Sequence, residues 1–168
     1  MKNQFKFIVM GMFALLFASC GPTKKEIIKY NDTIVFEQKA VINEEKIILD
    51  MASKLDVANI DKEYTKFKDV INAAIDKVSK LDEVDKEISL KDAALKLFEA
   101  YKSVAEKEYM ELVRITKIPT ELYTIEEQTK FKDASKVIDD KLNLELKNFL
   151  DVQKKLAEKH KFELTKDI

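Results

Sequence analysis

The sequence predicts an all-α protein, an antiparallel up-down four-helix bundle that follows a cleaved signal peptide. Four segments repeat apolar residues at helical spacing, and polar capping signatures precede three of them. No alternating strand pattern or hairpin turn signal occurs. Glycine is confined to Gly11 and Gly21, and cysteine to Cys20, so the chain beyond residue 21 lacks Gly-rich phosphate loops and Cys/His zinc sites.

The first helix is predicted over about residues 24–56. Thr23 and Glu26 form a capping box directly after Pro22, which is a sequence signature of a helix start. Apolar residues then recur at every seventh position, and a second apolar row runs beside the first. The first row is Ile27, Ile34, Val41, Ile48 and Leu55, and the second is Ile28, Val35, Ile42 and Leu49.

The second helix is predicted to start after a weak break at residues 56–61, with Asn59 or Asp61 as its N-cap. Its apolar positions alternate in steps of four and three, which is the packing seam of a bundle helix. These positions are Ile60, Tyr64, Phe67, Ile71, Ala74, Val78 and Leu81. An acid-rich connection over residues 82–88 follows.

The third helix is predicted to begin after Ser89, which forms a cap with Asp92, and to carry apolar residues as far as Ile115. Pro119 ends it, because the residue before a proline disfavours helix. Its apolar positions are Leu90, Ala94, Leu97, Phe98, Tyr101, Val104, Ala105, Leu112 and Ile115.

The fourth helix is predicted from the Thr124–Glu127 cap to about residue 161. Short polar connections between four such helices favour a single up-down bundle domain over residues 24–168. A three-helix bundle, in which the first two segments form one long helix, is the alternative. The apolar stripe of the fourth helix is Phe131, Ile138, Leu142, Leu146, Phe149 and Leu156.

Polar residues interrupt the apolar faces, and a buried polar group requires a partner. We call these residues, which are named below, the core polar row. Four interpretations are open: a hydrogen-bond network joined by tyrosine hydroxyls, a small-molecule cleft, a surface open to a partner chain, or a metal site. The di-iron bundle pattern fails, because Ala157 stands where a glutamate would precede His160. We predict no catalytic residue, metal ligand or cofactor. The candidate residues are Asn31, Gln38, Glu45, Glu108, Gln128 and Gln153, with Ser135 and His160 near the same face.

The N-terminus has the layout of a secretory signal: Lys2 and Lys6, an apolar run over residues 7–17, and small residues before Cys20. The stretch Leu16-Phe17-Ala18-Ser19-Cys20 resembles the bacterial lipobox. The resemblance implies that residues 1–19 are removed, that Cys20 carries a diacylglycerol and an acyl chain such as palmitate, and that residues 20–23 are a lipidated tether. A retained membrane anchor and an ordinary signal with a stray cysteine are the alternatives.

Removal of residues 1–19 takes away two lysines and leaves 28 basic and 31 acidic residues, interleaved without a basic block. Nucleic acid is therefore not an expected partner. Its Lys-, Ile- and Asp-rich helices and the stretch Tyr30-Asn31-Asp32 make the whole chain similar to small all-helical lipoproteins of Bacteroidetes- or spirochaete-type bacteria. The resemblance implies no defined activity. We expect an outer-membrane location, periplasmic or surface-facing. We expect a non-enzymatic binding or structural module with a membrane anchor and a protein partner in the envelope. The alternative is a small-molecule-binding bundle that uses the core polar row.

Overall fold

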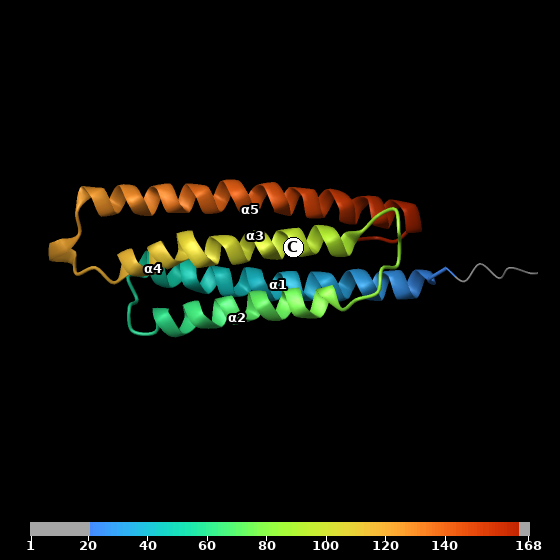
Figure 1. Cartoon of the computed structure of the whole chain (residues 1–168), viewed down its shortest axis with the longest axis horizontal. Helices are drawn as coiled ribbons and strands as arrows, with labels where there is room; N and C mark the ends of the chain where they lie inside the picture. The colour runs from blue at the N-terminus through green and yellow to red at the C-terminus, as the bar shows by residue number, and fades with distance from the viewer. Residues whose placement is uncertain (1–20, 165–168) are drawn as a thin grey trace, which may run out of the picture.

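The computed structural model describes residues 21–164 and confirms an all-helical, four-helix arrangement (Figure 1). The predicted signal peptide and Cys20 lie outside the described residues. The first two helices are α1, Lys24–Lys54, and α2, Ile60–Ser79. The third is a continuous rod made of α3 (Leu90–Val104), a π-helical turn η1 (Ala105–Tyr109) and α4 (Met110–Thr116). A 3₁₀ turn η2, Thr120–Leu122, leads into the fourth helix, α5, Ile125–His160.

The helices lie side by side with alternating direction, so the connections fall at two opposite ends (Figure 1). We call the end that holds residues 55–59 and 117–124 the distal end, and the end that holds the start of α1 and residues 80–89 the proximal end. α1 has 31 residues and, at 1.5 Å rise per residue, separates the two ends by about 46 Å. Within the described residues, no helix is both long and apolar enough to span a membrane.

Side-chain caps start three of the helices, as predicted. At α1, Thr23 Oγ1 accepts a hydrogen bond from the Glu26 backbone N–H at 3.3 Å, and Glu26 Oε2 accepts one from the Thr23 backbone N–H at 2.7 Å. Each bond satisfies a backbone donor that lacks a helical partner. At α3 and α5 the side chains of Ser89 and Thr124 accept hydrogen bonds from the backbone N–H groups of Asp92 and Glu127. The side chain of Asn59 makes no such bond at α2.

Two helices end in a left-handed residue that is not glycine. Leu55 after α1 and Lys161 after α5 both have φ of 54°. The turn lets the Leu55 and Asp56 backbone N–H groups reach carbonyls of the last helical turn, which closes the helix. Glycine normally occupies this position, because a β-carbon makes the left-handed conformation unfavourable by about 1–2 kcal/mol.

The inner faces of the helices form one apolar core that runs the length of the bundle. The predicted apolar seams supply most of it, and the periodicity therefore gave the correct phase for α1, α2 and α3. The largest fully buried side chains are Tyr109, Phe67, Phe98, Phe149, Ile27, Ile34, Ile48, Ile60, Ile71, Leu90, Leu97 and Leu112.

The third helix departs from the prediction, because the π turn at residues 105–109 adds a residue to one turn. The hydroxyl of Tyr64 in α2 donates a hydrogen bond to the Ala105 carbonyl at 2.7 Å, at the start of that turn. As a result Tyr109 points into the core and is fully buried, whereas Glu108, at the position expected in a regular helix, is displaced and half-buried.

Candidate functional site

The core polar row does not form one continuous site. Its proximal member, Asn31 on α1, is buried and pairs with Gln153 on α5: the Gln153 Nε2 group donates to Asn31 Oδ1 at 2.9 Å. This amide pair joins α1 to α5 through two residues that are 122 positions apart in the sequence. It fixes the register of α1 against α5, as buried amides do in coiled coils.

The middle member, Gln38, is fully buried, and neither its Nε2 nor its Oε1 has a hydrogen-bond partner among the described residues. An amide buried without partners is unfavourable by about 1–3 kcal/mol. Among the described residues, Gln38 is the buried side chain with two unsatisfied polar atoms, and this is unfavourable for the stability of the bundle.

The distal member, Glu45, is half-buried between two tyrosines of the third helix. Its carboxylate accepts hydrogen bonds from the Tyr109 hydroxyl at 2.5 Å and from the Tyr101 hydroxyl at 3.0 Å. Burial raises the pKa of Glu45, although both tyrosine bonds act to lower it. Burial and the nearby carboxylate also raise the pKa of Tyr101 and of Tyr109. Tyrosine hydroxyls beside the row are expected from the sequence, but Tyr109 is not among the inward positions that a regular helical period gives, because only the π turn brings it inward.

The remaining predicted residues differ in burial. Gln128 is exposed on the first turn of α5, so its predicted inward position is wrong. Glu108 is half-buried, and its Oε2 atom is enclosed without a hydrogen-bond partner among the described residues. Ser135 is half-buried and donates to the Phe131 carbonyl of its own helix.

His160 forms a separate proximal contact with the connection between α2 and α3. Its Nε2 lies 2.7 Å from Oδ2 of the buried Asp85, and Lys159 Nζ lies 2.7 Å from the same oxygen. Burial acts to raise the pKa of Asp85, but the bonds from Lys159, His160 and two backbone N–H groups outweigh it and hold the pKa well below its ordinary value. The contact ties the end of α5 to the α2–α3 connection, which is a structural role.

The core polar row does not line any of five pockets found on the described residues. Within residues 21–164, no group of three or more His, Cys, Asp or Glu side chains is placed to hold a metal ion. The row therefore supplies internal helix contacts and one unsatisfied amide.

Five of the eleven exposed large apolar side chains of the described residues lie at the distal end. We call Leu55, Val57, Leu122, Tyr123 and Ile125 the distal apolar cluster; all five are exposed, Ile125 at 84% and Leu122 at 67%. They lie in or beside the two connections at that end (Figure 1). The other exposed large apolar side chains are distributed along the helices. Exposed apolar side chains that gather on a soluble surface often mark an interaction site.

A pocket of about 220 Å³ joins the two halves of the distal apolar cluster. Leu55 lines it from the α1–α2 connection and Tyr123 lines it from the segment before α5. Its remaining walls are mostly apolar and come from the ends of α1, α4 and α5: Ala52, Ser53, Ile115, Thr116 and Phe131. The volume suits one large side chain of a partner better than a free ligand, since ligand pockets are usually about 300–1,000 Å³.

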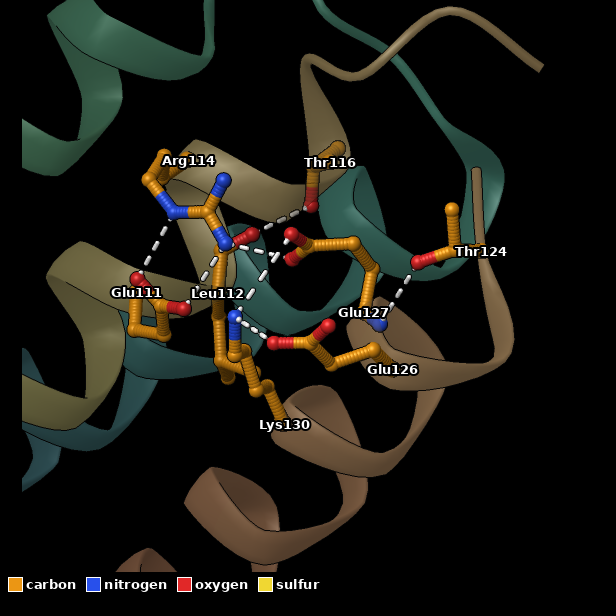
Figure 2. Close-up of polar contacts among 8 residues, drawn as sticks. All are labelled: Glu111, Leu112, Arg114, Thr116, Thr124, Glu126, Glu127 and Lys130. Carbon is orange, nitrogen blue, oxygen red and sulfur yellow. Dashed lines mark hydrogen bonds and ion pairs between the residues drawn. The ribbon is translucent and has the colours of Figure 1, made fainter. Parts of the chain in front are cut away.

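An ion-pair network supports the distal end beside this pocket (Figure 2). Arg114 on α4 pairs with Glu111 of its own helix and with Glu127 on the first turn of α5. These hydrogen bonds raise the pKa of Arg114, and the Arg114 bond lowers that of Glu111. Lys130 adds a contact to Glu126 at 2.8 Å. The network holds α4 against α5 and so sets the position of the segment that carries Leu122 to Ile125.

Helical periodicity does not predict the distal apolar cluster: it places Leu55 in the apolar row of the first helix, whereas Leu55 is 63% exposed, and it takes no account of apolar residues in the connections. The available signal was the occurrence of Leu55-Asp56-Val57 and Leu122-Tyr123 in segments that hydrophilic residues usually fill. Comparisons of the chain with protein-family models, curated proteins and solved structures find no match.

Proposed function

We propose that the chain is a bacterial envelope lipoprotein, anchored through lipid on Cys20, and that it acts without catalysis as a module that docks a partner protein at its distal end. The observation that carries the docking role is the distal apolar cluster around its pocket. The lipidation part rests on the resemblance of residues 16–20 to the lipobox.

The geometry is favourable for such a role. α1 starts at Lys24, only four residues after Cys20, so a lipid on Cys20 would hold the proximal end close to the membrane. Two or more acyl chains give stable anchoring, whereas one gives only marginal binding. The distal apolar cluster would then project about 46 Å along α1, as calculated from 1.5 Å per residue. We propose the outer membrane as the location.

Metabolic labelling with palmitate tests the anchor. Wild-type chain should incorporate label and sediment with membranes, and Cys20→Ser should do neither. Membrane retention of unlabelled Cys20→Ser would refute the lipoprotein proposal while leaving the docking proposal open.

Site-specific photo-crosslinking tests the docking role. A photoreactive amino acid in place of Leu122 should form a discrete crosslinked product in cells of the source bacterium. Phe36 is the matched control, since it is 66% exposed on the outer face of α1, against 67% for Leu122. Equal crosslinking from both positions, or none from Leu122, would refute docking at the distal end.

A further inference from the structure

We infer that the partner segment at the distal end is basic and apolar: one large apolar side chain enters the pocket, and flanking lysine or arginine side chains pair with Asp56 and Glu121. The inference rests on the proposed docking function and specifies the chemistry of the partner. It follows from the charges that surround the distal apolar cluster.

The distal end has more carboxylates than its own cations neutralise. Residues 50–62 and 111–130 contain seven acidic and five basic side chains. Four of the five cations are already paired within these segments. The pairs are Lys54 with Asp50, Arg114 with Glu111 and Glu127, Lys117 with Asp61, and Lys130 with Glu126.

Asp56 and Glu121 are the carboxylates that remain. Both are exposed, and neither forms an ion pair within residues 21–164. Asp56 lies between Leu55 and Val57, and its Oδ1 accepts a hydrogen bond from the Ala58 backbone N–H at 3.3 Å. Glu121 directly precedes Leu122. Each half of the cluster thus combines exposed apolar side chains with one unneutralised carboxylate, which is the complement of an apolar side chain flanked by cations.

Other occupants fit these charges less well. A second copy would bring the same carboxylates against their counterparts, and like charges in an interface are unfavourable. An anionic membrane surface would repel them. The described ends of the chain lie at the opposite, proximal end, where Lys24 Nζ donates a hydrogen bond to the Lys161 carbonyl at 2.5 Å. These ends are about 46 Å from the distal end along α1, at 1.5 Å per residue, so they do not cover the distal apolar cluster.

The test selects ligands from a random-peptide display library against the full-length lipidated chain in detergent micelles. The enriched peptides should combine a large apolar residue with nearby lysine or arginine. Their affinity for the charge-reversal variant Asp56→Lys/Glu121→Lys should fall by at least about tenfold, and it should weaken with added salt in the wild-type chain. Asp82→Lys/Glu163→Lys makes the same charge change at exposed proximal residues and should bind as wild type does.

Each other outcome overturns the inference in a distinguishable way. Acidic or uncharged peptides whose binding is lost in Leu122→Ser would refute the basic partner and leave distal docking intact. Peptides that bind Leu122→Ser as well as wild type, or no enrichment at all, would refute both. Self-association that Leu122→Ser abolishes would identify a second copy as the occupant. Circular dichroism of every variant checks that the bundle has folded.

Discussion

The contact between Tyr109 and Glu45 gives a direct test of the buried polar chemistry. Tyr109→Phe removes one hydroxyl and keeps the ring, which packs edge-to-face against Phe67 at a centroid distance of 5.1 Å. The change therefore deletes a hydrogen bond without opening a cavity. Glu45 retains its other bond, from Tyr101 at 3.0 Å.

A hydrogen bond to a charged group contributes about 1.5–3 kcal/mol. The Tyr109 bond is short, at 2.5 Å, and lies in the core, so we expect the free energy of unfolding to fall by about 2 kcal/mol. For a domain of this size that loss lowers the melting temperature by about 4–8 °C.

The loss should depend on pH. Because burial raises the pKa of Glu45 above its ordinary value of 4.5, the folded state holds this proton more tightly than the unfolded state does. The contribution of Glu45 to stability is therefore greatest below pH 4.5 and declines as pH rises through the folded pKa. Loss of the Tyr109 bond raises that pKa further, so the variant should differ least from wild type in acid and most at neutral pH.

Urea denaturation at several pH values measures this effect, since the slope reports whether compactness has changed as well. Tyr123→Phe is the control, because Tyr123 is exposed at the distal end. In a Glu45→Gln background the Tyr109→Phe change should be smaller, at most about 1 kcal/mol, since the acceptor is then neutral. If Tyr109→Phe lowers the free energy of unfolding by less than about 0.5 kcal/mol when Glu45 is present, or by an amount that does not depend on pH, the contact is not a buried charged hydrogen bond.

Three further substitutions probe the rest of the molecule. Gln38→Met should raise the free energy of unfolding by about 1–3 kcal/mol, because it removes two unpartnered amide atoms; a decrease in urea stability would show that the amide has a partner. Asp85→Asn should lower the melting temperature at neutral pH, because it weakens the contacts to Lys159 and His160. The pKa of Asp85 is depressed, so this stability is present above its ordinary value of 3.8 and is lost as pH falls through the folded pKa; equal wild-type and variant melting curves at pH 7 would contradict that. Leu55→Asn should leave stability unchanged or raise it by up to about 1 kcal/mol, because asparagine tolerates the left-handed turn; a larger drop in thermal stability would show that Leu55 packs into the bundle.

The fold could be predicted from the sequence because the apolar periodicity and the capping residues indicated the same helices. The seam of α2, from Ile60 to Val78, alternates steps of four and three, and all six of these side chains are buried. Caps at Thr23, Ser89 and Thr124 placed three helix starts within a residue of their positions in the structure. Such local signals are specific when the tertiary packing supports them.

The prediction of the third helix failed in detail because periodicity assumes a constant number of residues per turn. The π turn at residues 105–109 breaks that assumption, and the hydrogen bond from Tyr64 to the Ala105 carbonyl that accompanies it depends on a residue 41 positions earlier. No local pattern encodes that contact. The exchange of Glu108 for Tyr109 on the inner face follows from it, and so does half of the hydrogen bonding to Glu45.

The pattern on α5 shows a different limit. Gln128 and Gln153 project near the same face, yet only Gln153 is buried. Gln128 lies on the first turn of α5, beyond the point where the bundle covers that face, so its helical angle carries no information about burial. The position of a residue around the helix axis predicts its burial only where another helix packs against that face. The local sequence does not show along how much of its length each helix has such a neighbour.

Leu55 shows why stability alone does not explain the distal end. It occupies a left-handed C-terminal position where a β-carbon is unfavourable, and it exposes 63% of its surface. Glycine or asparagine would relieve the backbone, and a polar side chain would avoid the exposed apolar area. Leu122 and Ile125 also expose apolar area, on the segment before and at the start of α5. That segment and the α1–α2 connection both line the same pocket. Exposed apolar side chains at one end of the bundle are accounted for when a partner covers them, and this is the physical basis of the proposal that a partner docks at the distal end.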